Sequence, residues 1–527
     1  KTGAMLADIG KLFFYDIEEI TRRSQGVYSF DKKDSYFTKL KSFPYNTEIE
    51  ISLHFKGKKG KYIYTLPSST SVQIQYHISL SAIPKTNYVP RLADDRVGHF
   101  TTIYQDYTDI QKDSPYIRYV NRWNLEKQSP QAKISEPKQP IVYWIENSVP
   151  YDLRDAVREG ILAWNEAFEA AGYKNAIVVK QMPDDAKWDP ADVRYNTVRW
   201  MFQPGSGYAV GPSRANPYTG ELYDADIRIS ADFVRSFYRA YTEFVTPVIG
   251  PVAMDFETED DEEEFSSEMC MYGDYLREEM ASAWDIMTAT GKINGTDAEL
   301  QDYIHKGLVD LILHEVGHTL GLRHNFKASS IYSIEQLSDP SFTQNYGISG
   351  SVMDYQPINI FDGVTFFQTQ PGIYDIWAIE YAYKESNRSG YSEEEFLENI
   401  ASQSTDPLLR YGTDEDTFGL STRGMDPHSN AWDLSNDPIA YYKKRFEMSD
   451  ELVELIPEYF EKDGEQYSKL RRVFGRSLGQ YYSASRNIAK YIGGIYHSRH
   501  HVGDPGGGII HSRLSQLRSN VKHYTSF

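Results

Sequence analysis

Alternating apolar and polar residues mark the first part of the chain. Within residues 47–80, apolar side chains fill every second position over two runs, Ile49, Ile51, Leu53 and Phe55, then Val72, Ile74, Tyr76, Ile78 and Leu80. A period of two is typical of half-buried antiparallel strands. The polar, proline-containing stretch at residues 133–140 ends this pattern. We therefore predict a β-rich N-terminal domain over residues 1–137.

The pattern then changes to strands that alternate with a helix. After a short apolar run at residues 141–146, apolar residues recur at spacings of three and four from Leu153 to Phe168, and Gly172 follows. This spacing predicts an amphipathic helix that ends at the glycine. Further strands are predicted at residues 175–182, 193–202 and 224–230. Together these elements predict a mixed sheet with a helix packed on it.

The last part of the chain is polar and helix-like, most clearly at residues 450–492. We predict a mostly helical C-terminal domain over residues 389–527, which leaves residues 138–388 as the central, catalytic domain. A chain of 527 residues is too long for a single core, so several domains are expected. The predicted fold class is α+β.

Charge and cysteine content narrow the possible functions. The chain has 55 Lys and Arg against 75 Asp and Glu, and the formal net charge of −20 disfavours nucleic acid as a partner. The single cysteine, Cys270, excludes cysteine-rich zinc sites. The sequence has no apolar run of about 18 residues, so no transmembrane segment is predicted. The acidic run at residues 255–264 is interpreted as a solvated insertion, with a Ca²⁺ site as the alternative.

The stretch HEVGHTLGLRH at residues 314–324 holds the main candidate chemistry. It follows an apolar stripe that begins after Thr296, whose spacing from Glu299 fits a capping box, so the motif is expected near the end of a buried helix. His314 and His318 are four residues apart. This spacing places both imidazoles on one helix face, within reach of the same ion.

A glycine and a third histidine complete the motif. Gly321 can adopt a positive φ and end the helix, which lets His324 return as the third ligand. Three protein nitrogens leave one position of a zinc tetrahedron open for water, as is typical of a catalytic site. Glu315 follows the first ligand directly, where its carboxylate can accept a proton from water and pass it to a leaving amine. These residues predict a Zn²⁺-dependent hydrolase.

The pattern HExxHxxGxxH resembles the zinc signature of the metzincin metalloproteases. This resemblance implies a methionine turn below the metal, and SVMDY at residues 351–355 matches that turn with Met353. It also implies that Tyr355 serves as a distant metal ligand or as a hydrogen-bond donor to the transition state. The alternative is an ordinary aromatic residue, since the chain contains 41 tyrosines.

The resemblance extends to the order of elements around the motif. Metzincins place a strand, a helix, two strands and an edge strand before the zinc helix, similar to the order predicted between residues 141 and 230. The resemblance implies that residues 224–230 are the edge strand and that a substrate pairs with the backbone of Asp224, Ala225, Asp226 and Ile227. The alternative is an ordinary capped edge. Residues 371–383 resemble the helix that closes the metzincin C-terminal subdomain.

More particularly, residues 88–385 resemble a family of large secreted bacterial zinc metalloproteases, on segments such as HEVGHTLGLRHNF and SVMDYQP. This resemblance implies a protein or peptide substrate and an extracytoplasmic location, whether secreted, periplasmic or lipid-anchored. One position departs from better-studied metzincins, because Asn325 follows the third histidine. The specificity of those groups therefore does not transfer to this chain.

We predict a zinc metalloendopeptidase with ligands His314, His318 and His324 and with Glu315 as general base. Two alternatives stay open. One is a zinc amidase or exopeptidase that acts on cell-wall or glycoconjugate peptides. The other is a non-catalytic surface binding protein on the same fold, which the intact Glu315 disfavours.

Overall fold

The computed structural model describes residues 8–57, 66–108, 111, 114–202, 208–239, 271–361, 364–386, 390–418 and 422–505. The chain divides into two compact units. The first comprises residues 1–85 and 186–195, and the second comprises residues 86–185 and 196–527. The domain limits predicted near residues 137 and 388 stay predictions.

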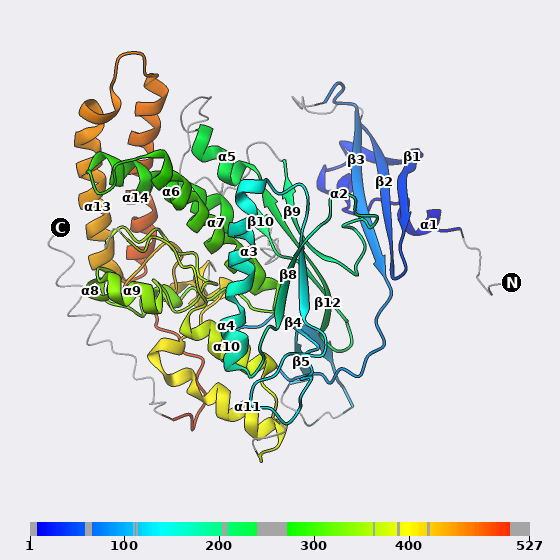
Figure 1. The fold of residues 1–527 in the computed structure, drawn as a ribbon. Helices are drawn as coiled ribbons and strands as arrows, with labels where there is room; N and C mark the ends of the chain where they lie inside the picture. The colour runs from blue at the N-terminus through cyan, green and yellow to red at the C-terminus, as the bar shows by residue number, and fades with distance from the viewer. Residues whose placement is uncertain are drawn as a thin grey trace. The chain divides into compact units, whose positions relative to one another are not determined.

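The first unit is built on a three-stranded antiparallel sheet of β1 (Tyr28–Ser42), β2 (Asn46–Gly57) and β3 (Ser71–Ser81), with β2 in the centre (Figure 1). The predicted antiparallel strands are present, but β2 is not half-buried, because its polar residues Ser52 and His54 are buried together with the fully buried Ile51 and Leu53. Ile51 and Leu53 pack in one cluster with Phe13 of the short helix α1 (Gly10–Phe13), and α2 (Ile20–Arg23) adds Ile20 to its margin. This unit is the β-rich beginning of the chain.

The second unit contains a mixed sheet with the order β10-β12-β9-β7-β8. The strands β7 (Ile141–Ile145), β8 (Ile177–Gln181), β9 (Asn196–Met201) and β12 (Glu221–Ser230) run parallel to one another. The short strands β10 (Ala209–Val210) and β11 (Ser213–Ala215) pair antiparallel with β12, and β6 (Arg122–Trp123) pairs parallel with it. The hairpin of β4 (Thr101–Gln105) and β5 (Tyr116–Val120) forms a separate two-stranded sheet.

The helix predicted after the first strand of this sheet is present as α3 (Arg154–Ala163) and α4 (Asn165–Ala170). Gly172 follows with a φ of +91°, as the predicted stop requires. The helix α3 lies against the long helix α7 (Asp297–Thr319) (Figure 1). Gly160 permits this approach, since a Cβ there would lie 2.8 Å from the Val309 oxygen. The indole of Trp164 also donates to the Leu313 carbonyl (2.8 Å), so α7 is anchored beside the sheet.

Helices dominate the rest of the second unit. They are α5 (Asp232–Arg239), α6 (Tyr272–Ala289), α8 (Ile334–Leu337), α9 (Pro340–Tyr346), α10 (Ile373–Tyr383), α11 (Glu393–Ala401), α12 (Asp414–Thr417), α13 (Pro438–Leu455) and α14 (Tyr467–Ala489). Ile286 of α6, Leu452 of α13 and Val473 of α14 share one buried cluster. The predicted α+β class, with a β-rich beginning and a helical C-terminal region, is confirmed.

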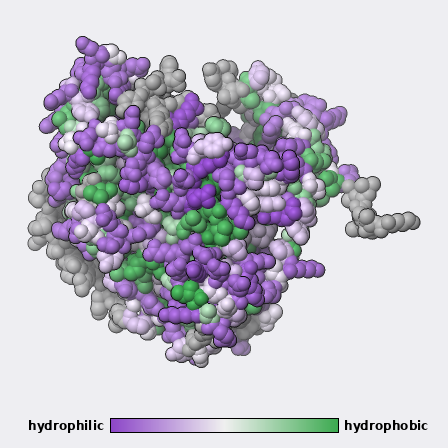
Figure 2. Space-filling view, in the orientation of Figure 1, coloured by the Kyte–Doolittle hydropathy of each residue, from purple (hydrophilic) through white to green (hydrophobic). Residues whose placement is uncertain are grey.

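Polar residues cover most of the surface, as expected when the apolar residues are packed inside. In the view of Figure 2, hydrophilic residues predominate and hydrophobic residues form small separate groups. Among the helices of the described residues, none is long and apolar enough to cross a membrane. The acidic run at residues 255–264, for which a Ca²⁺ site was the alternative interpretation, lies outside the described residues.

Candidate metal centre

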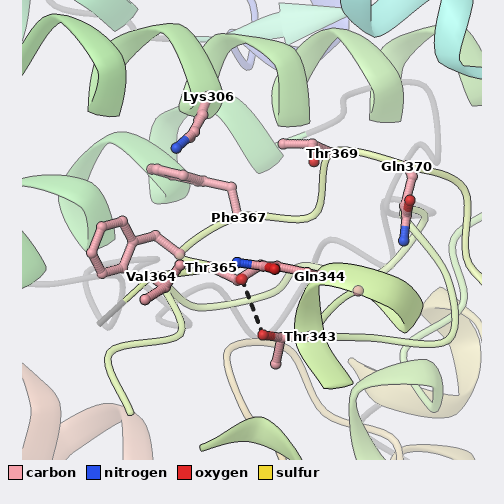
Figure 3. Close-up of a pocket in the computed structure, with 10 residues that line it drawn as sticks. Lys306, Thr343, Gln344, Val364, Thr365, Phe367, Thr369 and Gln370 are labelled. Atoms are coloured by element: carbon pink, nitrogen blue, oxygen red, sulfur yellow. Dashed lines mark hydrogen bonds between the residues drawn. The ribbon is translucent and has the colours of Figure 1, made fainter. Parts of the chain in front are cut away.

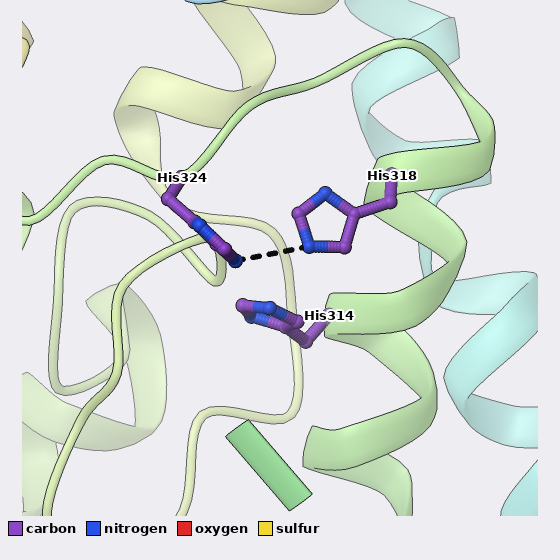
Figure 4. A group of neighbouring side chains, drawn as sticks. All are labelled: His314, His318 and His324. Carbon is purple, nitrogen blue, oxygen red and sulfur yellow. Dashed lines mark hydrogen bonds between the residues drawn. The ribbon is translucent and has the colours of Figure 1, made fainter. Parts of the chain in front are cut away.

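The three histidines of the motif come together at the end of α7. The predicted capping box of Thr296 and Glu299 begins this helix, which carries His314 and His318 on one face and ends at Thr319. His324 returns on the following loop, and Figure 4 shows the three rings turned toward one another. One nitrogen of each ring lies within 4.8 Å of the others, and all three side chains are buried.

Gly321 makes this return of the chain possible. Its φ is +99°, and a Cβ at this position would lie 2.0 Å from the Asn121 carbonyl oxygen. The Gly321 carbonyl accepts a hydrogen bond from the Phe100 amide (2.8 Å), and the Arg323 amide donates to the Gly98 carbonyl (3.0 Å). The loop therefore needs glycine for its conformation and for its close approach to a neighbouring segment.

Each imidazole is oriented by a hydrogen bond from its Nδ1. His314 donates to the Val352 carbonyl (2.7 Å) and His318 to the Leu322 carbonyl (3.0 Å). His324 donates to Oδ1 of Asp414 (2.8 Å). Carbonyl and carboxylate oxygens only accept, so the proton stays on Nδ1 and Nε2 is the nitrogen that can bind a metal.

The donor set fits a zinc ion. Nε2 of His318 lies 3.1 Å from Nε2 of His324. Since both rings donate through Nδ1, the two Nε2 atoms face each other with their lone pairs. A cation bound between them would stabilise this arrangement. Burial, followed by the neighbouring rings, lowers the pKa of His314 well below its ordinary value and that of His318 to about 3. The neutral rings are the form that binds a metal.

Asp414 is a member of this centre that the sequence did not reveal. It begins α12, which lies 90 positions after His324 in the chain. Burial alone would raise the pKa of its carboxyl, but His324 and then Arg323 hold it well below the usual range. Thr413 donates a hydrogen bond to its second oxygen (3.1 Å). Asp414 is therefore an ionised acceptor, and no local pattern in the sequence marks it.

Asn325, the position that departs from better-studied metzincins, joins three segments. Its backbone amide donates to the Met353 carbonyl (2.9 Å). In its side chain, Nδ2 donates to the Arg410 carbonyl (2.9 Å) and Oδ1 accepts from the Gly412 backbone amide (3.1 Å). The side chain is fully buried. Asn325 thus ties the histidine loop to the methionine turn and to the segment that leads into α12.

The methionine turn packs directly under α7. A Cβ added to Gly317, between the two helical histidines, would lie 2.3 Å from Sδ of Met353 and 2.8 Å from the Trp164 ring. Met353 is fully buried. The turn is anchored by Asp375, which accepts hydrogen bonds from the Val352 amide (2.8 Å) and from the Gly372 amide (2.7 Å). Burial raises the pKa of Asp375 to about 7.

Glu315 and Tyr355 both lie beside the histidines. Glu315 is fully buried on α7. The ring of Tyr355 is centred 4.8 Å from that of His324 and 5.6 Å from that of His314. Its hydroxyl oxygen accepts the amide hydrogen of Met271 (3.1 Å), which fixes the position of the oxygen beside the histidines.

The prediction that residues 224–230 form the edge of the sheet is wrong. Asp224 and Ala225 pair with β11, while Asp226 and Ile227 pair with β9. The strand β12 therefore has neighbours on both sides, and its backbone cannot receive a substrate by strand addition. The antiparallel strands β10 and β11 occupy the outer position. Gly211, between them, approaches α7 so closely that a Cβ there would lie 2.2 Å from the Glu315 carbonyl oxygen.

Other candidate sites within the described residues carry less chemistry. Two further groups combine acidic residues with a histidine, one around Asp34 and one around Asp94. In each group a basic side chain already pairs with a carboxylate, since Lys56 lies 3.0 Å from Asp34 and Arg96 lies 2.6 Å from Asp94. A cavity of about 210 Å³ is lined by Lys306, Gln344 and Phe367, among others (Figure 3). None of the three motif histidines lines it.

Comparison with known families agrees with the geometry. A family model described as Met-zincin matches residues 296–516. A domain of unknown function (DUF5117) matches residues 1–128. No curated protein and no solved structure matches the chain. The Met-zincin match includes the three histidines, the methionine turn and α12, so residues 296–516 are similar to Met-zincins and carry a histidine triad that is consistent with a zinc-binding motif.

Proposed function

We propose that the protein is a zinc-dependent endopeptidase with His314, His318 and His324 as metal ligands. The observation that carries the proposal is the set of three Nδ1 hydrogen bonds, which together turn three Nε2 atoms toward one point. Three protein ligands leave one coordination position open, as in catalytic zinc sites. When bound, zinc supplies Lewis acidity, which polarises a carbonyl and lowers the pKa of a water molecule to about 7.

Glu315 is the proposed general base and general acid. Its carboxylate follows His314 on α7 and accepts a proton from the attacking water as the oxygen adds to the scissile carbonyl carbon. The same carboxyl group then delivers that proton to the amine nitrogen as the peptide bond breaks. Water is consumed and one carboxyl and one amino terminus are formed, so Glu315 ends the cycle as it began.

Tyr355 is the proposed donor to the developing oxyanion. The Met271 amide holds its oxygen in place (3.1 Å), so the phenolic hydrogen can point to the substrate oxygen that gains negative charge. A fixed donor of this kind stabilises the transition state more than the ground state. Met353 supports the site from below α7 by packing against Gly317.

An extended substrate would pair with the outer edge formed by β10 and β11. Among the described residues, these strands pair with β12 alone, and Gly211 between them lies against the carbonyl of Glu315. Strand addition recognises the peptide backbone on both sides of the bond that is cleaved. This mode of binding supports cleavage within a chain rather than at its end.

The experiment that tests this proposal is mass spectrometry of a diverse peptide mixture after incubation with the zinc-loaded protein. Internal cuts by the wild type that are lost in Glu315→Gln, with equal zinc content in both proteins, are the expected result. Cuts confined to chain termini would favour the exopeptidase alternative. If the wild type binds zinc and leaves every peptide intact, the proposal fails.

We also propose that the protein acts outside the cytoplasm, as the family resemblance in residues 88–385 implies. Digestion of intact cells with an added protease, followed by immunodetection, tests this location. Protection of the chain in cells whose outer membrane has been permeabilised, with digestion only after lysis of the inner membrane, would contradict a location outside the cytoplasm.

A further inference from the structure

Trp432 has a backbone conformation that is unusual for its residue type. Its φ is +65°, in the left-handed region that bulky residues rarely adopt and that glycine or asparagine adopts at lower cost. Such strain persists only where the surroundings fix the backbone, and it is concentrated at functional sites. The residue lies between α12 and α13, outside the motif and the methionine turn.

Hydrogen bonds on both sides hold this conformation. The Trp432 amide donates to the Tyr355 carbonyl (2.8 Å). Before it, the Ala431 carbonyl accepts from Nδ2 of Asn487 (3.1 Å), and after it, Oδ1 of Asp433 accepts from the Ser329 hydroxyl (2.8 Å). These hydrogen bonds tie the Trp432 backbone to the methionine turn and so hold the indole beside Tyr355.

The indole lies one ring away from two of the proposed zinc ligands. Its centre is 5.6 Å from that of Tyr355 and 5.9 Å from that of Tyr272, with an angle of 16° between the planes in the second pair. Tyr272 stacks on His314 (4.4 Å), and Tyr355 lies beside the His324 ring. Tyr272 and Tyr355 are buried, whereas Trp432 is half-buried. The indole is thus the part of this stack that can offer a ring surface to a ligand.

We infer that Trp432 forms the wall of the substrate subsite beside the scissile bond and selects a large apolar or aromatic side chain at that position. This inference rests on the proposed function. A peptide that passes the metal centre would place the side chains next to the cleaved bond beside the ring stack of Trp432, Tyr355 and Tyr272. An indole face gains more from a large apolar side chain than from a methyl group, because it removes more apolar surface from water and permits ring stacking.

The choice of residue at this position agrees with that role. Asparagine would satisfy the left-handed backbone with less strain, and a half-buried indole adds less to the core than a buried one. A tryptophan held at positive φ beside the metal centre therefore fits contact with a substrate in addition to its packing against the main hydrophobic cluster.

The test compares two peptides that differ only in the residue next to the scissile bond, Phe in one and Ala in the other. The ratio of their kcat/KM values is measured for the wild type, Trp432→Asn and Trp432→Phe. Trp432→Asn removes the ring while it suits the backbone, and we expect the Phe-to-Ala ratio to fall by about tenfold or more with zinc content unchanged. Trp432→Phe should restore most of the ratio.

Trp144→Ala is the matched control, since Trp144 is a half-buried tryptophan on β7 in the same unit. It should leave the ratio unchanged. A ratio that stays the same in Trp432→Asn would overturn the inference.

A second measurement separates this inference from the proposed activity. Binding of hydroxamate-capped dipeptides with a Phe or an Ala side chain is followed by calorimetry in the zinc-loaded Glu315→Gln protein, where no cleavage is needed. A preference for Phe that disappears with Trp432→Asn supports the subsite even if no peptide is cut. Equal affinities of the two dipeptides in the Trp432-containing protein contradict it.

Discussion

Asp414 offers the sharpest test of the metal centre, because it is the only side chain among the three acceptors that orient the histidines. His314 and His318 donate to backbone carbonyls, which no substitution removes. His324 donates to the carboxylate of Asp414 at 2.8 Å. Replacing this carboxylate therefore perturbs one ligand and leaves the geometry of the other two unchanged.

The expected loss follows from the kind of hydrogen bond that is removed. A hydrogen bond to a charged group contributes about 1.5–3 kcal/mol, and a neutral one about 0.5–1.5 kcal/mol. Asp414→Asn keeps an acceptor oxygen but loses the charge, so it should weaken zinc binding by about 1.4 kcal/mol, or roughly tenfold in Kd. Asp414→Ala also leaves a buried Nδ1–H without an acceptor, so its loss should be nearer to 100-fold.

The assay is a zinc titration of the metal-free protein in competition with a chromophoric chelator at fixed pH. Glu415→Gln is the matched control, because Glu415 is the next residue on α12 and pairs with Arg323 (2.9 Å). Its side chain is 48% exposed, so removal of its charge should leave the zinc Kd nearly unchanged. Equal zinc affinities in the wild type, Asp414→Asn and Asp414→Ala would refute the argument that this carboxylate holds the third ligand.

Three further predictions concern groups around the ligands. Tyr355→Phe should lower kcat by about 100-fold or more with zinc content unchanged, and steady-state kinetics with an undiminished kcat would exclude the oxyanion role. Gly317→Ala should lower the free energy of unfolding in urea by about 1–3 kcal/mol, since the Cβ would lie 2.3 Å from Sδ of Met353. Gly475→Ala, on α14 with no atom within 4 Å of the added Cβ, should be neutral or slightly stabilising, and equal effects of the two changes would contradict the packing argument. Burial raises the pKa of Asp375 to about 7, so the folded state favours the protonated carboxyl. The free energy of unfolding should then fall by about 1.4 kcal/mol per pH unit as pH rises from about 4 to 7 and level off above. Asp375→Asn should lose this slope in urea titrations between pH 5 and pH 8, and an unchanged slope would assign it to other groups.

The ligand cluster could be predicted from the sequence because its geometry is local. The helix pitch alone brings His314 and His318 to one face, and Gly321 sets the turn that returns His324. The capping box at Thr296 also depends on residues only three apart, and it is present as expected. These features depend on contacts between residues that lie within a few positions of one another, so the sequence pattern was sufficient to predict them.

The edge of the sheet could not be predicted for the opposite reason. The outer strands β10 and β11 have two and three residues, too few for a period of two to be recognised. The resemblance to the metzincin order of elements therefore placed the edge at the longer run of residues 224–230. In the structure, Asp224 pairs with Arg214 (2.9 Å) and Asp226 accepts a hydrogen bond from the Thr197 hydroxyl (2.6 Å). Both carboxylates have partners on neighbouring strands of the sheet.

The groups that tune the centre come from the part of the chain to which the sequence assigned no role. A zinc motif specifies which atoms bind the metal, but the charge behind a ligand and the surface beside the substrate depend on which later segments pack there. Asp414 and Trp432 both follow residue 388, where the composition becomes polar and the catalytic domain was predicted to end. Polar composition reports exposure to solvent, whereas the bonds of Asn325 to residues 410 and 412 show that the histidine loop and this later segment are packed together. Substitutions in that segment should therefore change metal affinity and side-chain preference while the ligands themselves stay the same.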